Sequence, residues 1–127
     1  MKKPRSITVK TGTAHDFMEN VKHVMREADK GRAIKSSYTL TFEEPADMLH
    51  FLTETKMKLI RTIRKHPDSS ITELAKLTKR NRVAIDRDIC EMEEFGLLES
   101  REDINPGHGK HRIVTMTASK LHLEAYI

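Results

Sequence analysis

The segment that decides the fold is residues 69–100, SSITELAKLTKRNRVAIDRDICEMEEFGLLES. Its first part predicts a helix capped by Ser69 or Ser70, with an apolar face at positions 71, 74, 75 and 77. A polar turn at residues 78–80 leads to Asn81, which is a good cap for a second helix. We expect Gly96 to end that helix, because glycine enters the left-handed conformation at little cost.

The second predicted helix carries a buried stripe, and a hairpin follows it. After Gly96 come a strand at 97–99, a basic turn containing glycine and a return strand at 114–117. This order predicts a winged helix-turn-helix, which presents one helix and one hairpin to DNA. The stripe recurs at steps of four, three and three residues and consists of Ile85, Ile89, Met92 and Phe95.

Residues 1–52 add elements that a winged helix does not need. The pattern predicts a strand at 6–10, a helix at 15–30, a second strand at 37–43 and a short helix from Pro45. Because such a small sheet cannot bury both its edges and its face, we expect this extension to pair with a second copy or another protein. The alternative is that it packs on its own winged helix. The long helix carries an apolar face at Phe17, Val21, Val24, Met25 and Ala28.

The predicted fold is therefore α+β, a winged helix-turn-helix with an N-terminal strand-helix-strand extension that mediates dimerisation. The predicted domains are residues 1–52, for dimerisation or partner binding, and residues 53–127, for DNA binding. The second domain starts with a helix capped by Thr53 and ends with one more strand, where apolar residues alternate from 121 to 127.

Charge is unevenly distributed along the chain, whose formal net charge is +4. Residues 54–90 hold ten Lys or Arg against five acids, whereas residues 91–103 hold six acids and one Arg. A basic region beside an acidic one suits a surface that faces a polyanion. Composition alone favours the alternative, an ordinary solvated surface, and only the motif reverses that preference.

The sequence also indicates where the protein works. No apolar run approaches the roughly 20 residues that span a bilayer, and the N-terminal MKKPRS lacks an apolar signal segment. The single cysteine, Cys90, fits a reducing cytosol and is expected to be half-buried beside the stripe. We therefore expect a cytoplasmic protein without a membrane partner.

The buried stripe fixes which side chains of the second helix can face DNA bases. Arginines there can make bidentate contacts to guanine, and a valine can touch a thymine methyl group. Asp86 can accept a hydrogen bond from cytosine or orient a neighbouring arginine. The alternative for Arg87 is an ion pair in the neighbourhood of Asp86 or with Glu91, four residues further on. The predicted base-contacting residues are Arg82, Val83, Asp86 and Arg87.

Contacts to the DNA backbone are expected from three places: the start of the first helix, the turn and the wing. Helix N-termini favour anions, and hydroxyl and basic side chains add to this attraction. The alternative for the wing is a solvated hairpin tip. The predicted backbone-contacting residues are Ser70, Thr72, Lys79, Arg80, His108, Lys110, His111 and Arg112.

Catalysis and metal binding are not expected. His108 and His111 have a spacing that invites a metal interpretation, but no third ligand lies at a suitable spacing. We find no nucleophile with a base, no paired carboxylates and no phosphate loop. The prediction is a protein that is not an enzyme and uses no metal and no cofactor.

Residues 70–99, SITELAKLTKRNRVAIDRDICEMEEFGLLE, resemble the winged helix of MarR-like prokaryotic regulators. The resemblance lies in the capped first helix, the EExGLL ending at 93–98 and the glycine-containing basic wing. With LHFLTETKMKLIRTIRKHP at 49–67 and the alternating C-terminal strand, it narrows to small antitoxin-type winged-helix proteins. It implies a repressor or autorepressor that reads bases with the same four residues. Asp86 and Asp88 depart from the pattern, since small or basic residues are commoner there.

Three functions follow from these observations. The first is a homodimeric transcription regulator that binds a palindromic operator in double-stranded DNA. The second is a protein-interaction module that neutralises or scaffolds a partner, such as a cognate toxin, with weak DNA binding; combined with the first, it describes an antitoxin. The third is an RNA-binding module or ribonuclease, which the scarcity of aromatic residues disfavours.

Overall fold

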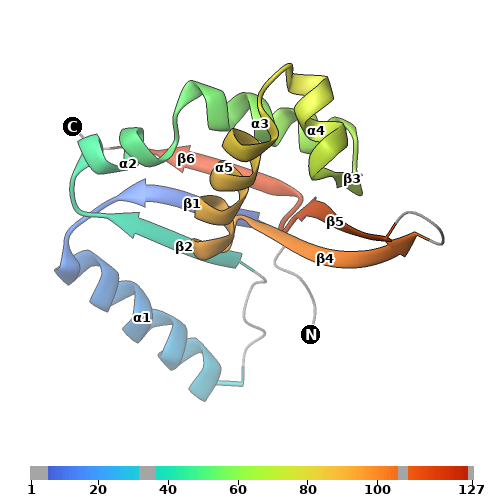
Figure 1. Ribbon diagram of the computed structural model, residues 1–127. Coiled ribbons are helices and arrows are strands. Elements are labelled where there is room, and N and C mark those ends of the chain that lie inside the picture. Colours follow the sequence, from blue (N-terminus) through green and yellow to red (C-terminus); the bar gives the residue numbers. More distant parts are fainter. Residues whose placement is uncertain (1–5, 32–36, 106–108, 126–127) are drawn as a thin grey trace. The chain divides into compact units, whose positions relative to one another are not determined.

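The elements of the winged helix appear in the predicted order in a computed structural model, which describes residues 6–31, 37–105 and 109–125 (Figure 1). Two compact units form: Met1–Phe51 with Ala118–Ile127, and Leu52–Thr117. The first holds β1 (Ser6–Thr11), α1 (Ala14–Asp29), β2 (Ser37–Phe42), α2 (Pro45–Phe51) and β6 (Lys120–Glu124). The second holds α3 (Glu54–Lys65), β3 (Ser69–Ser70), α4 (Ile71–Thr78), α5 (Arg82–Glu94), β4 (Leu98–Asn105) and β5 (Gly109–Met116).

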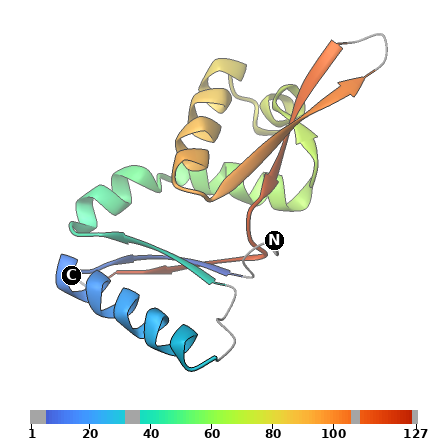
Figure 2. The same cartoon turned by 90° about the horizontal axis from the view of Figure 1, so that it is seen from below.

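The first unit is a three-stranded parallel sheet in the order β2-β1-β6. Ile7 and Val9 of the central strand are buried on one face, which α2 covers with Met48 and Phe51. The ring of Phe51 lies 5.7 Å from that of Phe42, centroid to centroid. This face therefore provides the core of the unit, and α1 lies on the opposite side of the sheet from α2 (Figure 2).

The C-terminal strand belongs to this first unit, which differs from the predicted division at 53–127. The alternation after residue 120 predicts a strand correctly, but β6 pairs in parallel with β1. Its register sets Leu121 beside Ile7 and Leu123 beside Val9, which extends the apolar face of the sheet. Alternation indicates which side chains share a face, and it says nothing about which strand will be the neighbour.

Helix α1 is strongly amphipathic, but none of its apolar side chains is buried by the described part of the chain. Thr13 and Asp16 form a capping box in which each side chain accepts a hydrogen bond from the other's backbone N–H at 3.1 Å. These hydrogen bonds lower the pKa of Asp16 below its usual value. No side chain of α1 is buried, and Met25 is 62% exposed. The predicted apolar face is thus available for a partner.

The second unit is the winged helix-turn-helix, which confirms the predicted fold class. Its helices α3, α4 and α5 pack with a sheet in the order β3-β5-β4. Ser70 caps α4 and Asn81 caps α5, and Gly96, with φ of 80°, follows the end of α5, as predicted. The wing strands are longer than predicted and pair from Leu98 opposite Met116 to Asn105 opposite Gly109. The core of the unit includes Leu59, Ile63, Leu74, Ile85, Ile89, Met92, Leu97 and Val114.

Four side chains differ from the expected burial. Phe95, the last residue of the predicted buried stripe, is the C-cap just past the end of α5 and is only half-buried. Leu77, predicted on the apolar face of α4, is 48% exposed, because at 100° per residue it turns about 120° away from Ile71. Cys90 is exposed rather than half-buried. Lys56, by contrast, is buried among the apolar positions of α3.

Candidate nucleic-acid interface

The N-terminal half of α5, the predicted recognition helix, presents an exposed outer face. Ile85 and Ile89 turn into the core and are fully buried. Arg82 and Arg87 are exposed on the other side, and Val83 is 76% exposed. An apolar side chain so exposed, between two arginines, has the chemistry of a thymine contact flanked by guanine contacts.

Asp86, the fourth predicted base-contacting residue, is held by the wing. Its Oδ1 lies 2.7 Å from Nη1 of Arg112, whose Nη2 lies 2.6 Å from Oε1 of Glu93. The Nε of Arg112 donates to Ser100 of β4 at 3.0 Å. Burial opposes the charge of this guanidinium, but hydrogen bonds to Cys90 and Glu93 and the negative charge of Glu93 outweigh it and raise the pKa of Arg112. Arg112 therefore joins the wing to α5 instead of projecting freely toward a phosphate.

Asp88 is a buried carboxylate that the sequence interpretation did not place in the core. Its side chain is only 7% exposed, and its Oδ2 lies 2.9 Å from Nη1 of Arg80. Arg80, predicted to contact the DNA backbone, is itself only 22% exposed. The alternative for Arg87, an ion pair near Asp86 or with Glu91, is present in the form of a contact with Asp88, at 3.8 Å from Nε to Oδ1.

Glu91 makes the third link, to buried Lys56 of α3. The Lys56 ammonium donates a hydrogen bond to Glu91 Oε2, and this bond lowers the pKa of the carboxyl group. The burial of Lys56 could be predicted from its helical spacing, although a lysine is normally expected at the surface. Lys56 precedes the core residues Ile60 and Ile63 at steps of four and three, so it lies on the buried face of the helix.

Together these contacts fix the recognition helix to its surroundings. Four of the five carboxylates in α5 are paired, each with a cation from outside the helix: Arg112 of β5, Arg80 of the turn or Lys56 of α3. The negative charge of Asp86 and Asp88 is thus compensated locally. Arg82, in the first turn, and Arg87, which also lies 3.8 Å from Asp88, stay exposed on the outer face of the helix.

The residues predicted to contact the DNA backbone differ in their exposure. Ser70 is buried, and its hydroxyl oxygen accepts the N–H of Glu73 at 3.1 Å, so it builds the start of α4. Thr72, in the first turn of α4, and Lys79, which ends α4 with φ of 56°, are both exposed. Lys110 and His111 lie in β5, but their side chains fall outside the described part of the chain, as does the whole of His108.

The described residues contain no candidate metal site and no candidate membrane-spanning helix. No group of three or more His, Cys, Asp or Glu side chains there could hold a metal ion. None of the helices placed in residues 6–31, 37–105 and 109–125 is long and apolar enough to cross a bilayer.

Comparison with known proteins places the same region in a family. A family model described as HVO_A0114 matches residues 51–123. A search of curated proteins gave no match. Among solved structures, a possible transcriptional regulator from Methanosarcina mazei Go1 has a TM-score of 0.49 and 17% identity, covering 61% of this chain and 68% of that one.

Two other structures have similar scores. The PcaV transcriptional regulator from Streptomyces coelicolor has a TM-score of 0.47 and 13% identity, covering 80% of this chain and 59% of that one. A MarR-like transcriptional regulator from Thermotoga maritima has a TM-score of 0.43 and 11% identity, covering 82% of this chain and 66% of that one. The chain therefore spans about three fifths to two thirds of the length of these structures.

Proposed function

Because the chain belongs to the HVO_A0114 family and carries a complete winged helix-turn-helix, we propose that it is a sequence-specific DNA-binding transcription regulator. The observation that carries this proposal is the exposed face of α5. Arg82, Val83 and Arg87 remain accessible there, while four carboxylates of the helix are paired with cations from other elements. This arrangement supplies direct base contacts without an opposing negative charge.

Each candidate residue has a distinct role in this proposal. Arg82, Val83 and Arg87 contact bases. Thr72 and Lys79 contact phosphates beside the helix N-termini, which favour anions. Lys110, His111 and His108 act from the wing. Asp86 and Arg112 position the wing against α5, and Ser70 positions the start of α4.

We further propose that the protein acts as a homodimer through α1. Phe17, Val21, Val24 and Ala28 are spaced by four, three and four residues, which is the spacing of a coiled-coil seam. In an antiparallel pair with a second copy, Phe17 lies opposite Ala28 and Val21 opposite Val24, so the largest side chain meets the smallest. Two reading helices related by this two-fold axis suit a palindromic operator.

Binding to the DNA upstream of the protein's own gene tests the first proposal. Fluorescence anisotropy over a salt series should show tight binding that weakens steeply as salt rises. Arg82→Ala should lose about 1–3 kcal/mol, or roughly 5- to 150-fold in affinity. The matched control is Lys22→Ala, which removes one exposed cation of α1 and should bind as the unchanged protein does. Equal affinity of Arg82→Ala and Lys22→Ala would refute the role of α5.

A second candidate function is that of an antitoxin, in which DNA binding serves autorepression and the extension binds a toxin. The exposed apolar face of α1 favours it, since a partner protein can cover that face in place of a second copy. Co-expression with the product of the neighbouring reading frame, followed by mass measurement during gel filtration, separates the two. A homodimer that takes up no neighbour contradicts the antitoxin hypothesis.

A further inference from the structure

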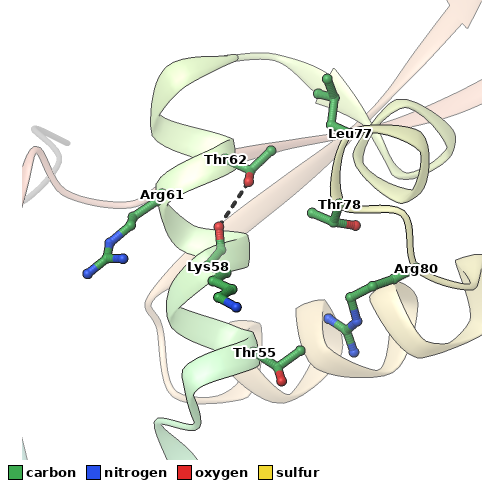
Figure 3. Close-up of a pocket in the computed structure, with 7 residues that line it drawn as sticks. All are labelled: Thr55, Lys58, Arg61, Thr62, Leu77, Thr78 and Arg80. Carbon is green, nitrogen blue, oxygen red and sulfur yellow. Dashed lines mark hydrogen bonds between the residues drawn. The ribbon is translucent and has the colours of Figure 1, made fainter.

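A hollow beside the helix-turn-helix has the chemistry of an anion site (Figure 3). It lies between α3 and the end of α4 with the following turn, and its volume is about 360 Å³, near the lower end of small-ligand pockets. No carboxylate is among its lining residues. They are Thr55, Lys58, Arg61, Thr62, Leu77, Thr78 and Arg80.

Three hydrogen-bond donors converge on the hollow from two elements. Lys58 and Arg80 extend toward it from opposite sides, with Thr55 at its lower edge, whereas Arg61 turns its guanidinium away (Figure 3). The other two hydroxyls already donate to backbone oxygens: Thr62 to Lys58 at 2.9 Å and Thr78 to Leu74 at 2.7 Å. An ammonium, a guanidinium and one hydroxyl therefore remain for a ligand with several acceptor oxygens.

Neither cation is fully committed elsewhere. Lys58 pairs with Glu54 at 3.3 Å, but these side chains are 68% and 84% exposed, and such surface pairs contribute little. Arg80 uses Nη1 for Asp88, and a guanidinium has five N–H donors in all. An incoming anion can engage the remaining N–H groups without breaking the contact to α5.

We propose that this hollow binds a phosphate group. Three donors from different directions suit a tetrahedral group with three or more acceptor oxygens, and Leu77 provides an apolar wall beside them. The phosphate is either carried by a free small molecule or belongs to the DNA backbone; the second source rests on the proposed function. In both cases Arg80 connects the bound phosphate to the recognition helix through Asp88.

The free-phosphate arm needs no DNA. Inorganic phosphate is titrated into the isotope-labelled full chain at constant ionic strength, and amide chemical shifts are followed by NMR. We expect saturable shifts at Thr55, Leu77 and Arg80, lost in Lys58→Gln and in Thr55→Val. The matched control is Lys22→Gln, whose lysine also sits in an exposed ion pair, with Glu19 at 3.6 Å, and which should titrate as the unchanged protein does.

The DNA arm measures the salt dependence of binding for the same variants. If the site holds a backbone phosphate, Lys58→Gln should weaken binding roughly tenfold and lower the slope of log K against log salt by about one. Saturable chemical shifts with phosphate, together with unchanged DNA binding of Lys58→Gln, support a free phosphorylated ligand. Weaker DNA binding of Lys58→Gln without saturable chemical shifts supports a phosphate of the DNA backbone. Unchanged DNA binding together with no saturable shifts overturns the proposal. Failure of the proposed function appears separately, as the unchanged protein not binding DNA at low salt.

Discussion

The ion pair between Arg80 and Asp88 should be the most sensitive electrostatic contact of the winged helix. The Asp88 side chain is 7% exposed, so removing its partner strands a charge in a largely water-free site. Breaking a buried pair in this way costs about 3–5 kcal/mol. Here Arg80 is 22% exposed and Arg87 still lies 3.8 Å away, so we expect Arg80→Met to lose about 2–3 kcal/mol of unfolding free energy.

Removing the acid should be milder than removing the base. In Asp88→Leu the freed guanidinium of Arg80 can reach solvent, so we expect a loss of about 1 kcal/mol or less. The double variant should be more stable than Arg80→Met alone, because the stranded charge is gone. Urea unfolding followed by circular dichroism gives all four corners of this double-mutant cycle, with an unchanged m-value as the check on two-state behaviour.

Heating provides an independent measurement of the same contact. For a unit of the size of residues 52–117, each 1 kcal/mol shifts Tm by about 4–8 °C, so the Tm of Arg80→Met should fall by roughly 8–24 °C. A loss below about 0.5 kcal/mol in Arg80→Met, or additive single effects, would refute the reasoning. Either result would mean that the contact with Arg80 does not stabilise the buried Asp88 side chain.

Three further predictions concern other parts of the chain. Val24→Asp on the seam of α1 should convert a dimer to a monomer in light scattering, whereas Lys22→Asp should leave the mass unchanged. Arg112→Gln leaves the carboxylates of Asp86 and Glu93 unpaired beside the exposed face of α5. DNA affinity measured by anisotropy should therefore fall roughly tenfold, whereas Glu93→Gln should have a smaller effect. The hydrogen bond from Lys56 lowers the pKa of Glu91 below its usual value, so the contribution of this pair to stability is present above the usual pKa and is lost as pH falls through the lowered pKa. Glu91→Gln should therefore flatten the acid limb of the stability curve in urea titrations, by less than about 1 kcal/mol because the side chain is 44% exposed.

Local signals in the sequence were enough to predict the helix-turn-helix. Ser70 and Asn81 cap the helices with bonds that span three and two residues, and Gly96 takes the left-handed conformation next to the helix it follows. The buried stripe of α5 likewise depends only on spacing within one element. Since the unburied face follows from the stripe, exposure of Arg82, Val83 and Arg87 could be predicted too.

Contacts between distant residues could not be predicted in the same way. Arg112 and Asp86 are 26 positions apart, and Lys56 and Glu91 are 35 apart. No periodic pattern relates such pairs, so Asp86 could be interpreted as a base reader and Arg112 as a wing tip cation. The partner of β6 was missed for the same reason, because many strand orders satisfy one alternating pattern.

The paired carboxylates also make the acidic helix α5 compatible with the proposed binding of DNA. A carboxylate free on α5 would repel phosphates, but one held by a cation from a neighbouring element adds no net charge and restricts the helix. The three cations come from α3, the turn and the wing, so each pair fixes α5 against a different neighbour. A reader fixed in this way loses less conformational entropy when it binds. Under the proposed function, the paired acids would improve recognition by holding α5, and with it Arg82 and Arg87, in place.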